Sequence, residues 1–231
     1  MKAKLLVIRT LLKRMADVQD DQKVLTHALG LSSLAYFSNS FIAKNLDKLD
    51  IPYKILEYQG MKCLIGETSD AIYIAFRGTE PSMWSNWKII LNFVPKYFMY
   101  DLKAHGGFVL YHKRYEQFIK DYINSIDKGK QIIFTGHSLG AAVASLYNIS
   151  YTKSSKCVCF ASPNLLFKDK FLSESSTSYR IMQDFVTWIP FSIPLYRWFR
   201  PNNTLKLKSK GKFSNPFKYH SLSNYVKSII K

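Results

Sequence analysis

The feature that most restricts the fold of this chain is a glycine-flanked turn between a predicted buried strand and a predicted helix of small residues. Residues 132–135 are apolar or β-branched, residues 136–140 are Gly-His-Ser-Leu-Gly, and residues 141–144 are three alanines and a valine. A side chain at either glycine would collide with the neighbouring strand or helix, so only glycine suits those positions. We expect the turn to hold Ser138 in a strained backbone conformation with its hydroxyl exposed.

The rest of the chain alternates predicted strands with predicted helices. Apolar and β-branched runs predict strands at residues 51–58, 61–65, 71–76, 157–161, 179–182 and 205–212, and helical periodicity predicts helices at residues 4–15, 20–37 and 109–126 and a short last helix. We expect a turn at residues 105–108. This alternation indicates an α/β fold with a mostly parallel central sheet and helices on both faces. We expect one domain over residues 1–231, with residues 1–24 as an N-terminal helical extension.

The chain carries a large excess of positive charge, with 33 Lys and Arg residues against 16 Asp and Glu residues. Such an excess is compatible with nucleic acid, an anionic membrane surface or an acidic substrate as the partner. The helix predicted at residues 4–15 is basic and amphipathic. It therefore either packs on the core or lies on a membrane surface.

Neither the cysteines nor the N-terminus indicates an exported, disulfide-bonded protein. The three cysteines are too few for a disulfide framework. Cys157 and Cys159 stand two residues apart in an apolar run, so we expect both thiols on one face of a strand, in reduced core packing and without metal. The apolar run at residues 5–8 is too short for a signal peptide, and no stretch reaches the ~20 residues of a membrane span. We expect an intracellular protein, soluble or peripherally bound to a membrane.

A serine hydroxyl is a strong nucleophile only when a base removes its proton, and the base is usually a histidine oriented by a buried carboxylate. On a sheet that presents serine at a strand-to-helix turn, the partners follow in the order serine, acid, histidine. Of five histidines, only His220 is C-terminal to Ser138. The acids between them are Asp169, Glu174 and Asp184. We favour Asp184, because it follows a predicted strand, whereas Asp169 lies in a charged segment typical of a solvated turn.

An oxyanion hole needs two donors directed at the developing negative oxygen. The backbone N–H of Leu139, directly after the serine, is the first. The second is expected at an earlier strand end on the same sheet edge, where Thr79 follows a predicted central strand. The alternative for Thr79 is an ordinary loop threonine. Loss of one such donor typically costs ~3 kcal/mol of transition-state stabilisation.

At these residues the chain resembles the class 3 lipases, the fungal-type triacylglycerol lipase family of the α/β-hydrolase fold. The resemblance extends over roughly residues 25–225. The similar motifs are residues 75–79, 86–87, 93–95, 105–108, 136–142, 160–163, 179–190 and 219–220. The resemblance implies a serine hydrolase that cleaves carboxylic esters of glycerolipids through an acyl-enzyme. It implies Ser138, Asp184 and His220 as the catalytic triad, and no cofactor.

The resemblance also implies a lid over the site at residues 81–91, with Trp84, Trp87 and Ile90 as substrate contacts. The alternative is an apolar core helix that does not move. The chain departs from the secreted fungal members in lacking a recognisable signal and disulfides. The segment between Ser138 and Asp184 is also short, which affects the acyl-binding side.

An aromatic run lies between the predicted acid and the predicted histidine, and no acidic residue follows Asp184. The run comprises Trp188, Phe191, Tyr196, Arg197, Trp198, Phe199 and Arg200. It forms either a rim that rests in a membrane interface or part of the core. Because each basic charge near an anionic bilayer contributes ~1 kcal/mol, we expect a lipid substrate at a membrane or droplet surface, with membrane glycerolipid favoured.

Two other functions remain open from the sequence. The first is a phospholipase A1 or a soluble esterase that uses the same residues. The second is a catalytically silent hydrolase fold that binds membrane or nucleic acid through its basic face. The presence of Ser138, Asp184, His220 and Thr79 together argues against a silent fold, and we expect no nucleic-acid partner.

Overall fold

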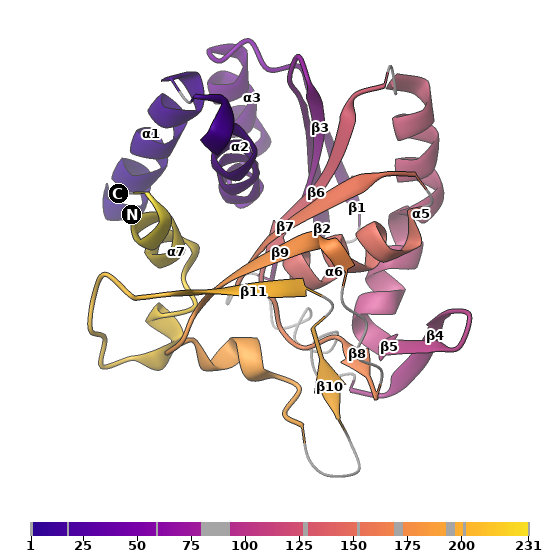
Figure 1. Ribbon diagram of the computed structural model, residues 1–231. Helices are drawn as coiled ribbons and strands as arrows, with labels where there is room; N and C mark the ends of the chain where they lie inside the picture. The colour runs from indigo at the N-terminus through magenta and orange to yellow at the C-terminus, as the bar shows by residue number, and fades with distance from the viewer. Residues whose placement is uncertain are drawn as a thin grey trace.

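A computed structural model describes residues 2–17, 19–58, 60–79, 93–126, 129–151, 153–168, 173–192, 197–200 and 202–230. Its centre is a seven-stranded sheet (Figure 1), counted over these residues. The strand order is β1 (Tyr53–Tyr58), β2 (Met61–Glu67), β3 (Ala71–Phe76), β6 (Gln131–His137), β7 (Ser155–Phe160), β9 (Ser173–Ile181) and β11 (Asn202–Leu207). The pairs β1–β2 and β2–β3 are antiparallel, and every later pair is parallel. The predicted mostly parallel sheet is confirmed.

Helices cover both faces of this sheet, as predicted (Figure 1). One face carries α1 (Lys2–Asp17), α2 (Asp20–Leu34), α3 (Asn39–Asp47) and α7 (Leu222–Ile229), and the other carries α5 (Gly106–Ile126) and α6 (Leu139–Ser150). The period of two along β3 divides its side chains between the two cores. Ile72, Ile74 and Phe76 pack toward α5 and α6. Ala71, Tyr73 and Ala75 pack toward α1 and α2.

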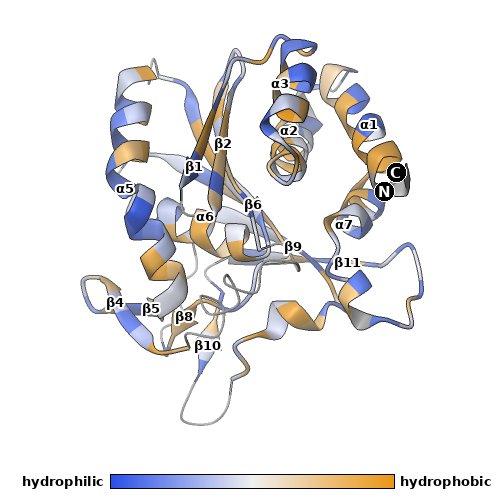
Figure 2. Ribbon diagram, turned by 180° about the vertical axis from the view of Figure 1, so that it is seen from behind, coloured by the Kyte–Doolittle hydropathy of each residue, from blue (hydrophilic) through white to orange (hydrophobic). Residues whose placement is uncertain are grey.

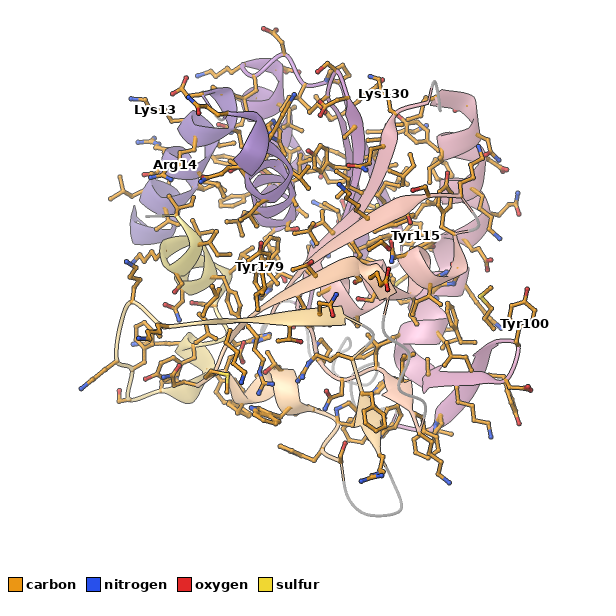
Figure 3. The ribbon with its side chains drawn as sticks, viewed as in Figure 1. Lys13, Arg14, Tyr100, Tyr115, Lys130 and Tyr179 are labelled. Atoms are coloured by element: carbon orange, nitrogen blue, oxygen red, sulfur yellow. The ribbon has the colours of Figure 1, made fainter. Side chains whose placement is uncertain are left out.

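The helices differ in how many of their sides are buried, and the distribution of apolar residues in each helix matches its burial. Residues 139–148 of α6 are all buried, so this helix is mostly apolar around its whole circumference. In Figure 2, α6 is mostly neutral to hydrophobic in colour, whereas α5 alternates hydrophilic and hydrophobic patches. The helix predicted at residues 4–15 packs on the core, because Ile8, Leu11 and Met15 are buried against α2 and α7. Its Lys13 and Arg14 point outward (Figure 3).

A small antiparallel sheet lies below the main sheet in Figure 1 and was not predicted. Its order is β10 (Trp198–Phe199), β8 (Leu166–Phe167), β5 (Leu102–His105) and β4 (Pro95–Met99). The turn predicted at residues 105–108 is wrong, because His105 ends β5 and α5 begins directly at Gly106. The glycine there serves close packing, since a Cβ at Gly106 would lie 2.6 Å from the carbonyl oxygen of Val94.

The strand predicted at residues 205–212 is also too long. It ends at Leu207, whose partner in the parallel pair is Ile181, the last residue of β9. β9 ends at Ile181 and the chain turns at residues 182–183, so the ladder stops there, and Lys208, Lys210 and Lys212 follow the strand as exposed residues. Helix α3 is a further element that the sequence analysis did not identify.

All three cysteines are buried thiols. Cys157 and Cys159 lie on one face of β7 as expected, with their Sγ atoms 3.2 Å apart. Over the described ranges, no helix has both the length and the apolar character needed to cross a bilayer. The segment expected to form a lid, residues 81–91 with Trp84, Trp87 and Ile90, lies outside the described residues.

Candidate active site

The turn between β6 and α6 holds Ser138 in an unusual backbone conformation, with φ 60° and ψ −127°. Both flanking glycines are required by close packing. A Cβ at Gly136 would lie 2.4 Å from the carbonyl carbon of Gly140, and a Cβ at Gly140 would lie 2.0 Å from the carbonyl oxygen of Phe76. The backbone N–H of Ser138 donates to the carbonyl oxygen of Phe160 at 3.0 Å. Neighbouring strands therefore hold the strained serine in place.

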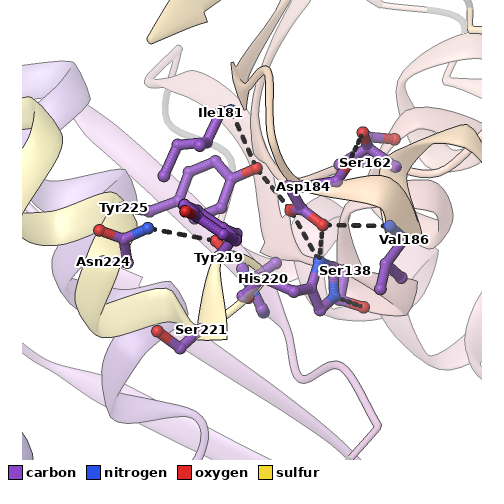
Figure 4. Close-up of polar contacts among 12 residues, drawn as sticks. Ser138, Ser162, Ile181, Asp184, Val186, Tyr219, His220, Ser221, Asn224 and Tyr225 are labelled. Carbon is purple, nitrogen blue, oxygen red and sulfur yellow. Dashed lines mark hydrogen bonds and ion pairs between the residues drawn. The ribbon is translucent and has the colours of Figure 1, made fainter. Parts of the chain in front are cut away.

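His220 stands between this serine and a buried carboxylate (Figure 4). Its Nε2 lies 2.7 Å from Ser138 Oγ. Its Nδ1 lies 2.8 Å and 3.0 Å from the two carboxylate oxygens of Asp184. A neutral imidazole that donates from Nδ1 to Asp184 has a free lone pair at Nε2 for the serine proton. The structure thus brings together the three residues that chain order selected, although 82 residues separate Ser138 from His220.

Asp184 is fully buried and is held by more than the histidine. The backbone N–H of Val186 donates to its Oδ1 at 3.2 Å. The hydroxyl of Tyr225 donates to its Oδ2 at 2.7 Å. Burial and the adjacent Asp184 charge hold the pKa of Tyr225 well above its ordinary value, so the phenol remains a donor. Tyr225 was missed by the sequence analysis, because one tyrosine in a short C-terminal helix has the appearance of ordinary core packing.

The expected oxyanion positions flank the serine turn. β3 and β6 are parallel neighbours, so the turn after β3 meets the turn after β6. A Cβ at Gly78 would lie 3.2 Å from the Cβ of Ser138, which shows how closely the two turns approach. Thr79 follows directly, and within the described residues its Oγ1 is buried without a hydrogen-bond partner. Leu139 is the first residue of α6, where backbone N–H groups have no partner inside the helix.

The loop that carries Asp184 is tied to the loop after β7. Asn164 Nδ2 donates to the carbonyl oxygens of Trp188 and Pro190, both at 3.0 Å. Arg200 donates from Nε to the carbonyl oxygen of Ser162 at 3.0 Å and from Nη2 to that of Thr187. Burial, with the nearby Arg180 charge, lowers the pKa of Arg200 to about 10. Sequence analysis did not identify Asn164 as part of the site.

The aromatic run between the acid and the histidine divides into two groups. Trp188 and Phe191 are 45% and 64% exposed, as a rim requires. Trp198 is buried beside Phe167 in the small sheet, so for this residue the core alternative is correct. Tyr196 lies outside the described residues. Of the other acids, Glu174 is exposed on β9 and Asp169 lies outside the described residues.

A comparison with protein-family models matches residues 73–193, more than half of the chain, to the family described as lipase (class 3). The chain belongs to the class 3 lipase family. The lipase is accordingly a serine ester hydrolase, and the matched segment contains the serine turn and Asp184. No curated protein sequence matches the chain.

Solved structures of fungal lipases share the fold of this class 3 lipase. The triacylglyceride lipase of Rhizomucor miehei superposes with a TM-score of 0.59 at 18% identity, covering 83% of this chain and 79% of the fungal chain. Lipase II of Rhizopus niveus gives 0.60 at 17% identity, covering 84% and 82%. Lip2 of Yarrowia lipolytica gives 0.59 at 16% identity, covering 89% and 84%. At this identity the likeness establishes the α/β-hydrolase fold.

Proposed function

We propose that this lipase hydrolyses carboxylic esters of glycerolipids with Ser138 as nucleophile, His220 as general base and acid, and Asp184 as the partner of His220. The observation that carries the proposal is the continuous hydrogen-bonded path from Ser138 Oγ through the imidazole to a buried carboxylate. Such a path activates a hydroxyl near neutral pH, because the base is within reach and its own charge is stabilised.

In the first half of the reaction, Ser138 Oγ attacks the ester carbonyl carbon as His220 Nε2 accepts its proton. The carbonyl oxygen becomes an oxyanion, which the backbone N–H groups of Leu139 and Thr79 bind. The tetrahedral intermediate then collapses. The bond to the alcohol oxygen breaks, and His220 Nε2–H donates its proton to that oxygen. The products are a free alcohol and an acyl ester of Ser138.

In the second half, water attacks the acyl carbonyl carbon while His220 Nε2 accepts a proton from it. The second intermediate releases the fatty acid, and the proton returns to Ser138 Oγ. The carboxylate of Asp184 faces the imidazolium that forms twice and stabilises its charge. The hydrogen bonds from Val186 and Tyr225 support this role, because they hold the carboxylate facing Nδ1.

The surface beside His220 supports a lipid surface as the place of reaction. Four large apolar side chains around the loops after β9 and β11 are exposed, namely Met182 (41%), Trp188 (45%), Phe191 (64%) and Phe217 (56%). Phe185 and Phe217 pack edge to face at 5.0 Å, which joins the acid loop to the histidine loop. Lysines on β11 and in the segment that follows it are exposed at positions 206, 208, 210, 212 and 218. We propose that these residues, here called the basic aromatic rim, contact an anionic membrane.

A second exposed aromatic group extends this contact on the hairpin of β4 and β5. Tyr97 and Tyr100 are 63% and 89% exposed, and Tyr100 projects from the hairpin (Figure 3). Lys103 lies over the Tyr97 ring at 4.5 Å, so basic and aromatic groups are interleaved here as well. Amphipathic aromatic and long basic side chains both suit the membrane–water interface. A membrane glycerolipid, including a phospholipid, is therefore the favoured substrate.

The hydrolysis proposal is tested by labelling with a fluorophosphonate probe and by release of fatty acid from triacylglycerol, diacylglycerol and phosphatidylglycerol dispersions. We expect labelling and fatty-acid release by the wild type and neither by Ser138→Ala, whose far-UV circular dichroism should be unchanged. Comparison of the phospholipid with the neutral lipids distinguishes a phospholipase A1 from a triacylglycerol lipase. A protein that reacts with the probe but releases acid only from water-soluble esters would contradict the lipid substrate.

Membrane contact is tested separately by flotation with vesicles of neutral phosphatidylcholine and of phosphatidylcholine with phosphatidylglycerol. We expect stronger binding to the anionic vesicles, and weaker binding after Lys210→Gln with Lys212→Gln. The matched control is Lys13→Gln with Arg14→Gln on α1, which removes the same charge from another surface. Equal binding of the wild type to both vesicles, or equal loss in both double variants, would refute contact through the rim.

A further inference from the structure

His137, the residue before the serine, makes two hydrogen bonds that the proposed mechanism does not use. Its imidazole is buried, with 5% of the residue exposed. Its Nε2 lies 2.9 Å from the backbone carbonyl oxygen of His220. Its Nδ1 lies 2.9 Å from the hydroxyl of Tyr36. A side chain of the nucleophile turn therefore contacts the main chain of the general base.

The direction of these two bonds follows from their chemistry. A carbonyl oxygen only accepts, so the bond to His220 places a proton on His137 Nε2. In a neutral imidazole Nδ1 is then the acceptor, and the Tyr36 hydroxyl donates to it. The resulting path runs from Tyr36 through His137 to the carbonyl oxygen of His220. The backbone N–H of His220 donates to the carbonyl oxygen of Phe217 at 3.1 Å. Both the N–H and the carbonyl group of the general base are therefore held by hydrogen bonds.

Tyr36 also touches the turn that carries the expected oxyanion residue. A Cβ at Gly78 would lie 2.2 Å from the Tyr36 hydroxyl oxygen and 2.5 Å from the carbonyl oxygen of His137. Tyr36 lies just after α2, outside all three loops of the site. The pair of Tyr36 and His137 thus contacts the turn before Thr79, the serine turn and the histidine loop.

We propose that Tyr36 and His137 are positioning residues that keep His220 and the Gly78 turn in register with Ser138. The proposal rests on the proposed function for its effect on turnover. The physical reason is that proton transfer depends on a distance of 2.7 Å between Ser138 Oγ and His220 Nε2, and a displacement of about 1 Å costs roughly 100-fold in rate. Asp184 orients the imidazole of His220, and His137 fixes the main chain from which that imidazole extends.

Three variants separate the two bonds. Tyr36→Phe removes one hydroxyl and keeps the ring, His137→Leu removes both bonds, and His137→Gln keeps one donor and one acceptor. We expect Tyr36→Phe and His137→Leu to lower kcat about 10-fold to 100-fold with KM nearly unchanged. His137→Gln should recover most of the loss. Because both residues act through one path, Tyr36→Phe should have little further effect in the His137→Leu background.

The control for loss of a buried tyrosine hydroxyl is Tyr115→Phe, because Tyr115 donates to the carbonyl oxygen of Met61 at 2.8 Å away from the triad. It should lower Tm without changing kcat per active site. Active sites are counted with the fluorophosphonate probe, so a smaller folded fraction does not appear as a lower kcat. If His137→Leu does not fold, Tyr36→Phe and His137→Gln still test the path.

A wild-type kcat per active site in both Tyr36→Phe and His137→Leu would overturn the proposal. It would also be overturned if the decrease in kcat of the double variant equalled the product of the two single decreases. The rate of fluorophosphonate labelling provides a second readout, since it depends on the same base but not on a lipid substrate. If the wild type hydrolyses no glycerolipid ester, the proposed function fails, whereas the order of labelling rates among the variants still tests the positioning role.

Discussion

The hydroxyl oxygen of Tyr225 lies 2.7 Å from Oδ2 of Asp184, the same oxygen that lies 2.8 Å from His220 Nδ1. A phenol from α7 and an imidazole from the preceding loop therefore share one carboxylate oxygen. The Tyr225 hydroxyl also accepts the backbone N–H of Ile181 at 3.1 Å. The tyrosine thus joins the end of β9, the acid and the C-terminal helix.

Tyr225→Phe should weaken catalysis without abolishing it. The change removes a hydrogen bond to a buried charge, which typically contributes ~1.5–3 kcal/mol, while the histidine and Val186 bonds to Asp184 remain. We expect kcat per active site to fall about 10-fold and Tm to decrease. The measurement is kcat with fluorophosphonate-counted active sites, and an unchanged kcat would show that the phenol has no part in holding the acid.

Asp184→Asn should remove nearly all turnover while the protein stays folded. An amide at this position can donate to the imidazole and favour the wrong tautomer, and in a comparable triad this change costs ~10⁴-fold in kcat. The neutral amide also cannot stabilise the imidazolium. Fatty-acid release and circular dichroism together check the prediction. Retention of a tenth of wild-type kcat would assign the acid to another residue.

Asn164→Ala should destabilise the loop that carries Asp184. Asn164 is 7% exposed, and its amide donates to the carbonyl oxygens of Trp188 and Pro190, which the change leaves unpaired. Loss of a buried partner typically costs ~1–3 kcal/mol. The free energy of unfolding, measured with urea, should decrease by this amount. The matched control is Asn45→Ala, because Asn45 donates to the carbonyl oxygen of Phe41 at the half-exposed surface of α3. An equal loss of unfolding free energy in both variants would contradict the prediction.

The protein should become less stable as the pH decreases, because His112 is buried. Burial lowers its pKa from 6.5 to about 4, while the nearby Glu116 charge opposes the shift. The folded protein therefore binds a proton at His112 less readily than the unfolded chain does. The stabilising contribution of neutral His112 is therefore complete above about pH 6.5 and is lost as the pH falls toward 4.

We expect this group to lower the free energy of unfolding by about 2 kcal/mol between pH 7 and pH 5. The measurement is urea unfolding at both pH values for the wild type and His112→Gln. The variant keeps a donor for Ser150, which lies 3.0 Å from His112 Nε2, but it does not titrate. The decrease should be smaller in the variant, and equal decreases would assign the pH dependence to other groups.

Local sterics and chain order made the core of the site predictable. The role of the glycines around Ser138 could be predicted, because a side chain at either position would collide with the strand and helix directly beside it. Asp184 and His220 could be selected because only one histidine follows the serine and one acid follows a predicted strand. The parallel sheet followed from the alternation of strand and helix patterns, which depends on short-range periodicity.

The tertiary structure alone decided which groups support these residues. Tyr36, Asn164 and Tyr225 have no distinctive neighbours in sequence, and each bonds to a residue 24 or more positions away in the chain. The start of α5 and the end of β11 were mispredicted for a similar reason, since both depend on a partner strand elsewhere in the chain. Periodicity reports which face of an element is apolar, but a hydrogen bond between distant loops exists only once packing has brought them together.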